Sequence, residues 1–483
     1  MVKKNLKILF AAYECAPFYK RGGLGGVIGS LSKTLKKMGV DVRVVIPHYQ
    51  AIRSSYPSLK KKNSLKIKIA REELLVDVFE SRLPGSAVPV YFIGNKYFHT
   101  DKIFDDDSRF RFALFSSLMI KTQDLFAWQP DIIHANDWHT GLISVFLKKA
   151  GLPVKTVFTI HNLAYTGKTS LATLARLGLT EKDFFSVENG TVTVMREAIL
   201  KSDSITTVSL SYAKEILTPE FDCGLGDALR KRKKDLVGIL NGLDYDVFSP
   251  EKDKFISVRY SSESLDKKAV NKIALQKASG LVVNSATPLL GIISRLAGQK
   301  GFDLLESITG ELMRLDLQLV VLGTGDPHYE KFLARLNEHY SGSFCAHLKF
   351  DASLSNQIYA GSDLFLMPSQ YEPCGLGQLA AMKYGNLPLV RQTGGLKDTV
   401  TGFTGKNIKT ANGFSFAEYQ AGELFKTIKQ AIAVFHDQKT WRALQSNAMR
   451  ADFSWNRSAA KYLKLYQKLA LTLPHARKKD LNR

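Results

Sequence analysis

Short hydrophobic runs alternate with amphipathic segments along the first half of the chain. Five of these runs have the length and residue types of buried strands: 6–13, 40–47, 131–134, 154–160 and 204–208. Helical patterns lie between them, at 30–38, 108–125 and 191–201. Strands that alternate with helices indicate βαβ units around a parallel sheet. We therefore predict one α/β domain that extends to about residue 240.

The alternation stops in the polar, charged segment 251–280 and then starts again. Strand-like runs recur at 288–294, 317–322, 344–350, 363–367 and 387–390, and a helical region follows at 417–469. This pattern predicts an α/β protein of two facing, doubly wound Rossmann-like domains with a deep cleft between them. The predicted boundaries are 1–245, 246–455 and 456–483, where the last segment is a helix that packs on the N-terminal domain and ends in a basic tail.

Length and composition agree with a large globular protein. A chain of 483 residues is long enough for two or three domains, and 45% hydrophobic with 23% charged residues excludes extensive disorder. No hydrophobic stretch approaches the about 18 to 20 residues of a membrane-spanning helix. The run 8–12 follows Lys3, Lys4 and Lys7 as in a signal peptide, but Glu14 ends it early. We interpret it as a buried first strand and expect no membrane partner.

The net charge is +22, from 67 Lys and Arg against 45 Asp and Glu. Such an excess suggests a nucleic-acid partner, but the densest basic run, 230–234, lacks interleaved aromatic residues. We predict a solvated loop or helix face there and no nucleic-acid binding. The four cysteines form no CxxC pair, which excludes a zinc knuckle or a dense disulfide framework. A reducing compartment fits this cysteine usage, so we expect a cytoplasmic location.

A glycine-rich loop, Lys20-Arg21-Gly22-Gly23-Leu24-Gly25-Gly26, lies between the first predicted strand and its helix. Glycines let backbone N–H groups approach an anion at a helix N-terminus, and a lysine adds positive charge. The spacing matches neither GxGxxG nor a Walker A loop. The residues alone leave an anion-binding loop and a flexible turn equally open.

Polar residues gather where two strands of the first domain end. His134, Asp137, Trp138 and His139 follow one strand, and His161 follows the next. Open α/β sheets bind ligands at the carboxyl ends of their strands. Carboxylate and imidazole groups serve as hydrogen-bond partners for sugar hydroxyls. They also ligate metals, but no cluster that offers a third ligand stands nearby, so we expect no metal.

In the second domain, Arg295 and Lys300 lie five residues apart after a predicted strand. Two fixed cations neutralise a diphosphate leaving group without a metal. Gly323 and Gly325 form a turn suited to the approach of a nucleoside. Glu372 stands at a further strand exit, before a new helix, where it can face the transferred group.

Taken in order, these segments resemble the bacterial glycogen synthases and plant starch synthases, which are retaining glucosyltransferases of the GT-B fold. The matching motifs span nearly the whole chain: Lys20-x-Gly22-Gly23-Leu24, His134-x-x-Asp137-Trp138-His139, His161-Asn162-Leu163-Ala164-Tyr165, Thr207-Val208-Ser209, Asn241-Gly242-Leu243-Asp244, Ser294-Arg295-Leu296 with Gln299-Lys300-Gly301, and Glu372-Pro373-Cys374-Gly375-Leu376. The resemblance implies transfer of glucose from ADP-glucose to the non-reducing end of an α-1,4-glucan, glycogen or maltodextrin, with retention of the α configuration and without a metal or other cofactor.

The resemblance also implies roles for individual residues. Those implied in catalysis are Glu372, Asp137, His161, Arg295 and Lys300. Those implied in donor binding are Lys20, Gly22, Gly23, Asn241, Gly323, Gly325, Cys374, Gly375, Leu376, Gly394 and Gly395. Those implied in contacts with the acceptor or sugar are His139, Trp138, Asn162 and Tyr165. We interpret Glu372 as a stabilising carboxylate rather than a covalent nucleophile.

Three positions depart from the family pattern. Gly26 stands where the family usually has aspartate, Gly377 where threonine is common, and Ile103-Phe104 where a Tyr-Gly pair is usual. These departures leave two alternatives open, a UDP-glucose-using relative and a catalytically weakened glucan-binding relative. The oligomeric state cannot be predicted from the sequence.

Overall fold

The computed structural model describes residues 6–70, 72–103, 105 and 107–473. The chain forms two compact units, and each is described by itself. Unit 1 comprises residues 1–242 and 455–483, and unit 2 comprises residues 243–454. The sequence analysis sets its boundaries after residues 245 and 455. The basic tail 474–483, Lys3, Lys4 and Phe104 lie outside the described residues.

Unit 1 is built on a nine-stranded sheet with the order β11-β10-β7-β6-β1-β2-β5-β4-β3. Its strands are β1 (Lys7–Ala11), β2 (Asp41–Pro47), β3 (Lys60–Ile69), β4 (Glu72–Arg82), β5 (Pro89–Gly94), β6 (Ile132–Asn136), β7 (Lys155–Ile160), β10 (Ser204–Thr207) and β11 (Leu236–Gly238). The strands from β11 to β5 are parallel, whereas β4 pairs antiparallel with both β3 and β5. A two-stranded ribbon of β8 (Lys168–Ser170) and β9 (Thr191–Thr193) stands apart from this sheet.

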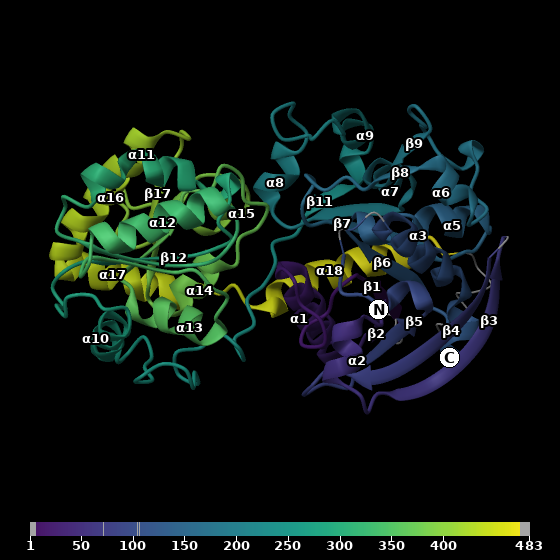
Figure 1. Cartoon of the computed structure of the whole chain (residues 1–483), viewed down its shortest axis with the longest axis horizontal. Helices are drawn as coiled ribbons and strands as arrows, with labels where there is room; N and C mark the ends of the chain where they lie inside the picture. The colour runs from purple at the N-terminus through teal and green to yellow at the C-terminus, as the bar shows by residue number, and fades with distance from the viewer. Residues whose placement is uncertain (1–5, 71, 104, 106, 474–483) are drawn as a thin grey trace. The chain divides into compact units, whose positions relative to one another are not determined.

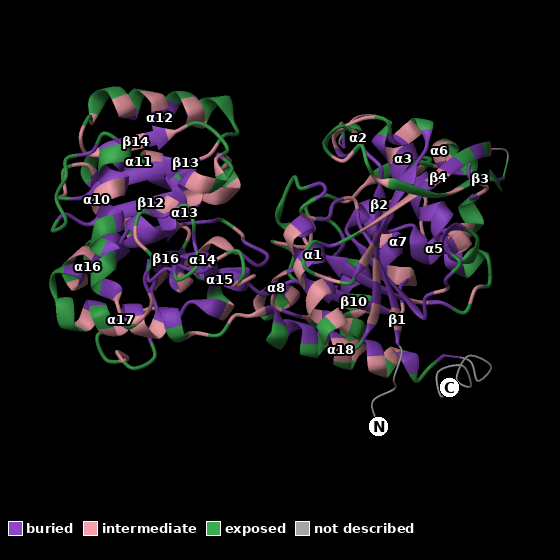
Figure 2. Cartoon of the chain, turned by 90° about the horizontal axis from the view of Figure 1, so that it is seen from below, coloured by how far each residue is buried: buried purple, intermediate pink, exposed green. Residues whose placement is uncertain are grey.

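Parallel strands need crossover connections, which helices supply. The helices of unit 1 are α1 (Gly23–Lys37), α2 (Gln50–Ser55), α3 (Ser108–Leu118), α4 (Thr122–Phe126), α5 (Ile143–Lys149), α6 (Leu171–Ala175), α7 (Val194–Lys201), α8 (Leu210–Glu215), α9 (Gly226–Lys231) and α18 (Trp455–Ala470). Every residue of β6 and β10 is buried, which explains why these strands read as short hydrophobic or small-residue runs. Figure 2 shows the buried strands inside each unit and exposed residues along its outer helices.

Unit 2 contains a six-stranded, fully parallel sheet with the order β14-β13-β12-β15-β16-β17. Its strands are β12 (Leu289–Ile293), β13 (Gln318–Leu322), β14 (Phe344–His347), β15 (Leu364–Met367), β16 (Leu387–Arg391) and β17 (Phe414–Phe416). Its helices are α10 (Lys268–Ala278), α11 (Phe302–Leu312), α12 (Pro327–His339), α13 (Ala352–Gly361), α14 (Gly377–Lys383), α15 (Gly394–Thr399), α16 (Ala421–His436) and α17 (Gln438–Arg450). Figure 1 shows this unit mainly in green, with helices on both faces of the sheet. The prediction of two doubly wound Rossmann-like domains is confirmed.

Each sheet has a point at which the chain changes the direction in which it adds strands. In unit 1 the chain runs from β1 to β2 and β5, and then places β6 on the other side of β1. In unit 2 it runs from β12 to β13 and β14, and then places β15 on the other side of β12. Open α/β sheets bind ligands beside such a switch point, at the carboxyl ends of the strands. The loops after β1, β6, β12 and β15 are therefore the places to look for a site.

Helix α1 begins at Gly23, whereas the prediction placed its start at residue 30. Gly29 packs against the backbone of Ala16, where an added Cβ would lie only 2.8 Å from the carbonyl oxygen. Close packing of the helix against the preceding loop therefore outweighs the low helix propensity of glycine.

The predicted helical region 417–469 is confirmed, since it contains α16, α17 and α18, whereas two predicted helices differ in detail. The segment 108–125 divides into α3 and α4. The segment 191–201 opens as β9, because Thr191, Val192 and Thr193 are β-branched and suit a strand. The long hairpin of β3 and β4 has no counterpart in the prediction, since its exposed, lysine-rich strand β3 lacks a hydrophobic run.

The C-terminal helix α18 belongs to unit 1, where it lies beside α1. His134 of β6 links α18 to the sheet of unit 1. Hydrogen bonds join its Nδ1 to the Tyr466 hydroxyl (2.6 Å) and its Nε2 to the Thr159 hydroxyl (2.5 Å). Burial lowers the pKa of His134 to about 3, so the ring is neutral. His134 therefore has a structural role in docking α18.

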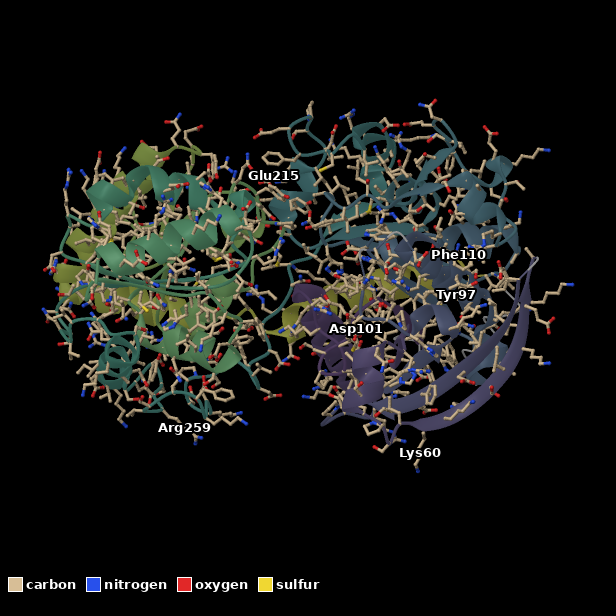
Figure 3. All side chains as sticks on the ribbon, viewed as in Figure 1. Lys60, Tyr97, Asp101, Phe110, Glu215 and Arg259 are labelled. Atoms are coloured by element: carbon tan, nitrogen blue, oxygen red, sulfur yellow. The ribbon has the colours of Figure 1, made fainter. Side chains whose placement is uncertain are left out.

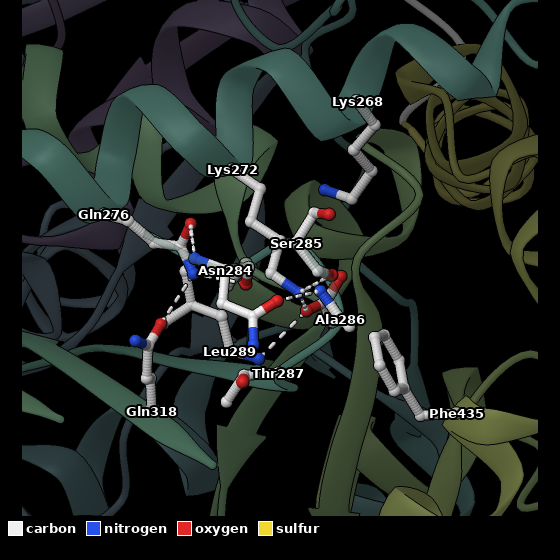
Figure 4. Close-up of polar contacts among 12 residues, drawn as sticks. Lys268, Lys272, Gln276, Asn284, Ser285, Ala286, Thr287, Leu289, Gln318 and Phe435 are labelled. Carbon is white, nitrogen blue, oxygen red and sulfur yellow. Dashed lines mark hydrogen bonds and ion pairs between the residues drawn. The ribbon is translucent and has the colours of Figure 1, made fainter. Parts of the chain in front are cut away.

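Two lysines of α10 extend into the interior of unit 2 (Figure 4). Lys268 Nζ donates hydrogen bonds to the carbonyl oxygens of Tyr359 (3.2 Å) and Ala360 (2.6 Å), in the last turn of α13. Lys272 forms an ion pair with Asp363 (2.7 Å) and donates to the Ser285 carbonyl (2.8 Å). These buried cations join α10 to α13 and to the start of β15.

Candidate active site

The carboxyl ends of β12 and β15, at the switch point of unit 2, bring Lys300 and Glu372 together. Lys300 Nζ lies 2.5 Å from Glu372 Oε2, and both side chains are largely buried, with 18% and 10% exposure. The Ser369 hydroxyl donates a longer hydrogen bond to the same oxygen (3.3 Å). Two of the predicted catalytic residues, 72 positions apart in the sequence, thus form one ion pair.

Backbone contacts fix this pair on both sides. Gln299 donates from Nε2 to the Tyr371 carbonyl (3.1 Å), and the Gln370 amide donates to the Gln299 carbonyl (2.9 Å). Gly301 adopts a left-handed conformation with φ of 79°, and a Cβ there would lie 2.2 Å from the Pro368 carbonyl oxygen. The turn before α11 is therefore locked to the loop after β15.

Arg295 lies two residues after the end of β12 and is exposed. It has no acidic partner among the residues that the structure describes. Lys300 carries three N–H donors, of which Glu372 accepts one, so two remain for a further acceptor. Two cations and one carboxylate thus follow strands that end at the same edge of the sheet. The sequence analysis predicts the cations as ligands of a diphosphate and the carboxylate as a group that faces the sugar.

The two glycines predicted to admit a nucleoside lie against the backbone of a neighbouring loop. A Cβ on Gly323 would lie 1.9 Å from the Ser294 carbonyl oxygen, and one on Gly325 would lie 2.2 Å from that of Leu296. These glycines let the loop after β13 pack against the loop after β12. Their contact with a ligand stays a prediction.

The turn at Gly394 and Gly395 packs in the same manner on the loop that carries Glu372. A Cβ on Gly394 would lie 1.9 Å from the Glu372 carbonyl oxygen, and one on Gly395 would lie 2.0 Å from that of Cys374. The Gly395 amide donates to the Glu372 carbonyl (3.1 Å). The start of α15 is therefore part of the support of Glu372.

The remaining predicted donor residues of unit 2 lead into α14. Cys374 is buried, Gly375 adopts φ of 69°, and Leu376 precedes the first helical residue. Gln378 donates to the carbonyl oxygens of Cys374 (3.1 Å) and Gly375 (3.0 Å), which fixes the turn. These residues lie in the same loop as Glu372.

In unit 1, Asp137 follows β6 at the second switch point. Its Oδ1 accepts hydrogen bonds from the backbone amides of His161 (2.8 Å) and Asn162 (3.4 Å), which follow β7. Asp137 has φ of 56° and ψ of 177°, a conformation that costs a residue with a side chain about 1 to 3 kcal/mol. The fold thus holds this carboxylate in a strained, specific position.

The electrostatics of this site follow from burial. Burial raises the pKa of Asp137 to about 7, against two backbone hydrogen bonds that lower it, and the Glu14 carboxylate adds to the rise. Burial also lowers the pKa of His161 to about 3, so the imidazole is neutral. A hydrogen bond of 2.9 Å joins His161 Nε2 and Asn136 Oδ1, which makes this nitrogen the donor.

The other predicted sugar contacts of unit 1 divide into exposed and buried residues. Asn162 is half-buried and Tyr165 is 46% exposed, both close to His161 in sequence. Trp138 and His139 are buried, and the His139 ring lies 3.8 Å from that of Tyr13 and 4.2 Å from that of Trp138. Trp138 and His139 therefore form part of an aromatic cluster, and their contact with a sugar stays a prediction.

The predicted donor residues of unit 1 lie in two places, the glycine-rich loop and Asn241. Lys20, Gly22 and Gly23 are exposed at the start of α1, after β1. Asn241 is buried, and its Oδ1 has no hydrogen-bond partner among the described residues. Its neighbour Gly242 packs on Trp455, where a Cβ would lie 2.6 Å from the backbone.

The basic run 230–234 is mostly exposed, in agreement with the predicted loop or helix face. Its central residue, Arg232, donates hydrogen bonds to the carbonyl oxygens of Ile199 (2.9 Å), Leu200 (2.8 Å) and Ser202 (2.7 Å). It therefore caps the C-terminus of α7. Within the part of the chain that the structure describes, no three His, Cys, Asp or Glu side chains group as a metal site, and every helix is too short or too polar to cross a membrane.

Comparison with known proteins decides the family. Residues 7–231 match the starch synthase catalytic domain, and residues 277–450 match the glycosyl transferases group 1. A glycogen synthase from Clostridium beijerinckii is 43% identical over 482 residues, which cover 96% of this chain and 99% of that protein. One from Thermotoga maritima is 41% identical with the same coverage. The chain belongs to the glycogen synthase family. It is a glycosyltransferase that acts in glycogen synthesis.

Solved structures agree with this family. The catalytic domain of starch synthase IV from Arabidopsis thaliana, bound to ADP and acarbose, is 31% identical, has a TM-score of 0.89, and matches 97% of this chain and 100% of its own. A sucrose-phosphate synthase from Thermosynechococcus elongatus, 16% identical with a TM-score of 0.62, shares the fold. The GT-B fold expected for a glycogen synthase is confirmed.

Two residues of this glycogen synthase family member escaped the sequence analysis. The strand predicted at 344–350 ends at His347, which leaves Phe350 88% exposed in the loop after β14. Its exposed aromatic ring makes Phe350 a candidate contact for a ligand, and the hydrophobic run in the sequence conceals this exposure. Glu14 is fully buried beside the glycine-rich loop, although the sequence shows it only as the residue that ends a hydrophobic run.

Proposed function

We propose that this glycogen synthase family member transfers glucose from ADP-glucose to the non-reducing end of an α-1,4-glucan, with retention of the α configuration. The observation that carries the proposal is the ion pair of Lys300 and Glu372 at the switch point of unit 2, where Arg295 follows the same strand, β12, as Lys300. The ADP bound in the related starch synthase structure supports an adenosine diphosphate leaving group.

The charges of unit 2 suit the two ends of the bond that breaks. Transfer from a sugar nucleotide develops positive charge at the anomeric carbon and negative charge on the departing diphosphate. Arg295 and the two remaining donors of Lys300 stabilise the diphosphate. Glu372 stabilises the positive charge that develops on the sugar. Its Oε2 accepts hydrogen bonds from both Lys300 and Ser369, so that oxygen is a poor covalent nucleophile.

Phe350 provides a platform for the base in this proposal. Its loop follows β14, at the same carboxyl edge of the sheet as Arg295 and Glu372, because all strands of unit 2 are parallel. An exposed aromatic ring stacks on any nucleobase, because every base has a π-face. Stacking alone therefore does not choose between adenine and uracil, and the donor is tested directly below.

Unit 1 supplies polar groups for the glucosyl unit. The Asp137 carboxylate is held by two backbone amides, and the neutral His161, whose Nε2 donates to Asn136, offers Nδ1 as an acceptor. Such fixed groups hydrogen-bond sugar hydroxyls and need no reorganisation when the sugar becomes charged. Lys20 adds a cation at the glycine-rich loop.

The proposal includes transfer without a metal. Two fixed cations supply the charge stabilisation that a divalent ion gives to a diphosphate in other transferases. The acceptor is a neutral glucan, so the excess of positive charge is not required for its binding. The cytoplasmic location expected from the sequence stays a prediction.

The experiment is incorporation of radiolabelled glucose into glycogen from ADP-glucose, in the presence of EDTA. Digestion of the product with β-amylase is expected to release labelled maltose, because this enzyme cleaves α-1,4 bonds from non-reducing ends. Label that resists β-amylase contradicts the proposed linkage. Incorporation that EDTA abolishes contradicts the metal-free reaction.

A further inference from the structure

The glycine loop, residues 20–26, is attached to a buried carboxylate. Glu14 follows β1, is fully buried, and accepts hydrogen bonds on Oε2 from the backbone amides of Arg21 and Gly22, the latter at 3.0 Å. Helix α1 begins at the next residue, Gly23. A negative charge at this place is stabilised by the helix dipole. The backbone amides of Arg21 and Gly22, just before the helix, therefore bind the Glu14 carboxylate of the protein itself.

The glycines of the loop fit around this carboxylate. A Cβ on Gly25 would lie 3.3 Å from Glu14 Oε2 and 3.3 Å from the Tyr19 carbonyl oxygen. A Cβ on Gly22 would lie 3.5 Å from Glu14 Oε1. A side chain at position 25 would therefore crowd the carboxylate and the backbone at once. Packing inside the protein explains this glycine, without a ligand.

The Arg21 side chain anchors the other side of the loop. Its Nε donates to the Tyr19 hydroxyl (3.0 Å), and its Nη2 donates to the Asp101 carbonyl oxygen (3.4 Å). The Tyr19 hydroxyl donates to the same carbonyl (3.3 Å), at the residue labelled in Figure 3. Lys20 lies between these two anchored residues and stays exposed, with no acidic partner among the described residues.

We propose that Glu14 is a positioning residue of the donor site. It holds the glycine loop in one shape, so that Lys20 is presented to the diphosphate of the donor. It also occupies the Arg21 and Gly22 amides, so the loop contributes the charge of Lys20 rather than these two N–H groups. The effect on the donor rests on the proposed function, whereas the effect on the loop does not.

Trypsin tests the effect on the loop, because it cleaves after Lys20 and Arg21. In Glu14→Ala we expect cleavage at these two bonds to become at least about tenfold faster, since loss of a charge-assisted anchor frees the loop. Cleavage at the exposed Lys231 and Lys233, followed by mass spectrometry in the same digest, is expected to stay unchanged. Glu220→Gln, an exposed residue of the same unit, serves as the matched control.

Kinetics test the effect on the donor. In Glu14→Ala we expect the KM for ADP-glucose to rise about tenfold and kcat to change less, because the loop must be ordered at binding. Glu14→Gln is expected to restore most of both losses, since its carbonyl oxygen accepts the same two amides. If Glu14→Ala does not fold, Glu14→Asp, whose carboxylate is withdrawn by one methylene, is expected to show the same selective changes.

The outcomes separate the two proposals. Wild-type cleavage at Lys20 and Arg21 in Glu14→Ala overturns the positioning role, and so does faster cleavage along the whole unit, which indicates a general loss of stability. A loss of kcat with unchanged KM also overturns it. If the wild-type chain does not use ADP-glucose, the proposed function fails. Selective cleavage after Lys20 and Arg21 in Glu14→Ala would still show that Glu14 orders the glycine loop.

Discussion

The Lys300 ammonium lies 2.5 Å from the Glu372 carboxylate, although 72 residues separate them in the sequence. The contact exists because β12 and β15 are neighbours in the sheet and both strands end at the same edge. It places a cation for the leaving group and an anion for the sugar side by side. This pair is the centre of the proposed donor site.

The pair is expected to act as a unit in catalysis. Lys300→Met and Glu372→Gln should each lower kcat/KM for ADP-glucose by about 100-fold or more, as is typical for loss of a preorganised electrostatic group. The double variant should lose much less than the product of the two effects, because each single change leaves its partner charge uncompensated. Initial rates of labelled-glucose transfer measure all four proteins. Strict multiplicativity contradicts a coupled pair.

Asp137 gives unit 1 a pH dependence with a definite sign. Its pKa is about 7 in the folded chain against an ordinary 3.8, because of burial, so the folded state binds more protons between these values. Its contribution to stability is therefore largest at low pH and is lost as pH rises to 7, by at most about 1.4 kcal/mol per pH unit. Urea unfolding of the wild type and Asp137→Asn from pH 4.5 to 8 measures the difference. Parallel curves contradict the raised pKa.

Phe350 is expected to contribute to donor binding. Stacking on a base is worth about 1 to 3 kcal/mol, so Phe350→Ala should raise the KM for ADP-glucose by roughly tenfold with a smaller change in kcat. Phe185→Ala removes another exposed aromatic ring, 54% exposed in unit 1, and serves as the control. An equal effect of the two substitutions means that Phe350 has no specific contact with the donor.

At Gly26, where the resemblance implies an aspartate, we expect the substitution Gly26→Asp to be tolerated. No atom of the described residues lies within 4 Å of a Cβ added there, at the fourth residue of α1. Replacing a helical glycine and adding a negative charge near the N-terminus should together stabilise the chain by about 0.5 to 1 kcal/mol. Gly29→Ala is the control that should destabilise it, since its Cβ would lie 2.8 Å from the Ala16 carbonyl. Thermal unfolding of the wild type and the two variants tests this prediction. A Gly26→Asp variant that is less stable than the wild type contradicts it.

Lys268 links stability of unit 2 to alkaline pH. Burial lowers its pKa from an ordinary 10.5 to about 7, so the unfolded chain binds more protons between these values. Stability from this residue therefore rises with pH above 7, by at most about 1.4 kcal/mol per pH unit. Lys268→Met removes the titrating group. In urea unfolding from pH 7 to 9.5, the free energy of unfolding of the wild type should rise relative to that of the variant. A constant difference between the two proteins would falsify the buried-lysine account.

Local patterns predicted which residues end the strands, because each motif directly follows its own hydrophobic run. Asp137, Arg295 and Glu372 were placed at carboxyl ends of strands in this way, and the structure confirms those positions. The contact of Glu372 with Lys300 depends on the order of strands in the sheet, which no local pattern encodes. The packing of Gly323 against the Ser294 backbone also depends on neighbouring strands, β12 and β13, and no local pattern predicts it.

Other features depend on burial and exposure, which a residue type does not reveal. Glu14 in the sequence is a charge that interrupts a strand, and only the fold shows that it is buried against the amides of the glycine loop. Phe350 extends a hydrophobic run in the sequence but is exposed, because β14 ends three residues earlier. The hairpin of β3 and β4 buries alternate residues of β4, Leu74, Val76 and Val78, so its hydrophobic positions form no continuous run that the sequence analysis would detect.

The most direct measurement of the central claim compares donors. Wild-type protein is given glycogen and, in parallel, ADP-[14C]glucose or UDP-[14C]glucose, and kcat/KM is measured for each donor. We expect transfer from ADP-glucose to be at least about tenfold more efficient than from UDP-glucose, a difference of about 1.4 kcal/mol. Equal or preferred use of UDP-glucose contradicts the proposed donor, and no transfer from either donor contradicts the proposed function.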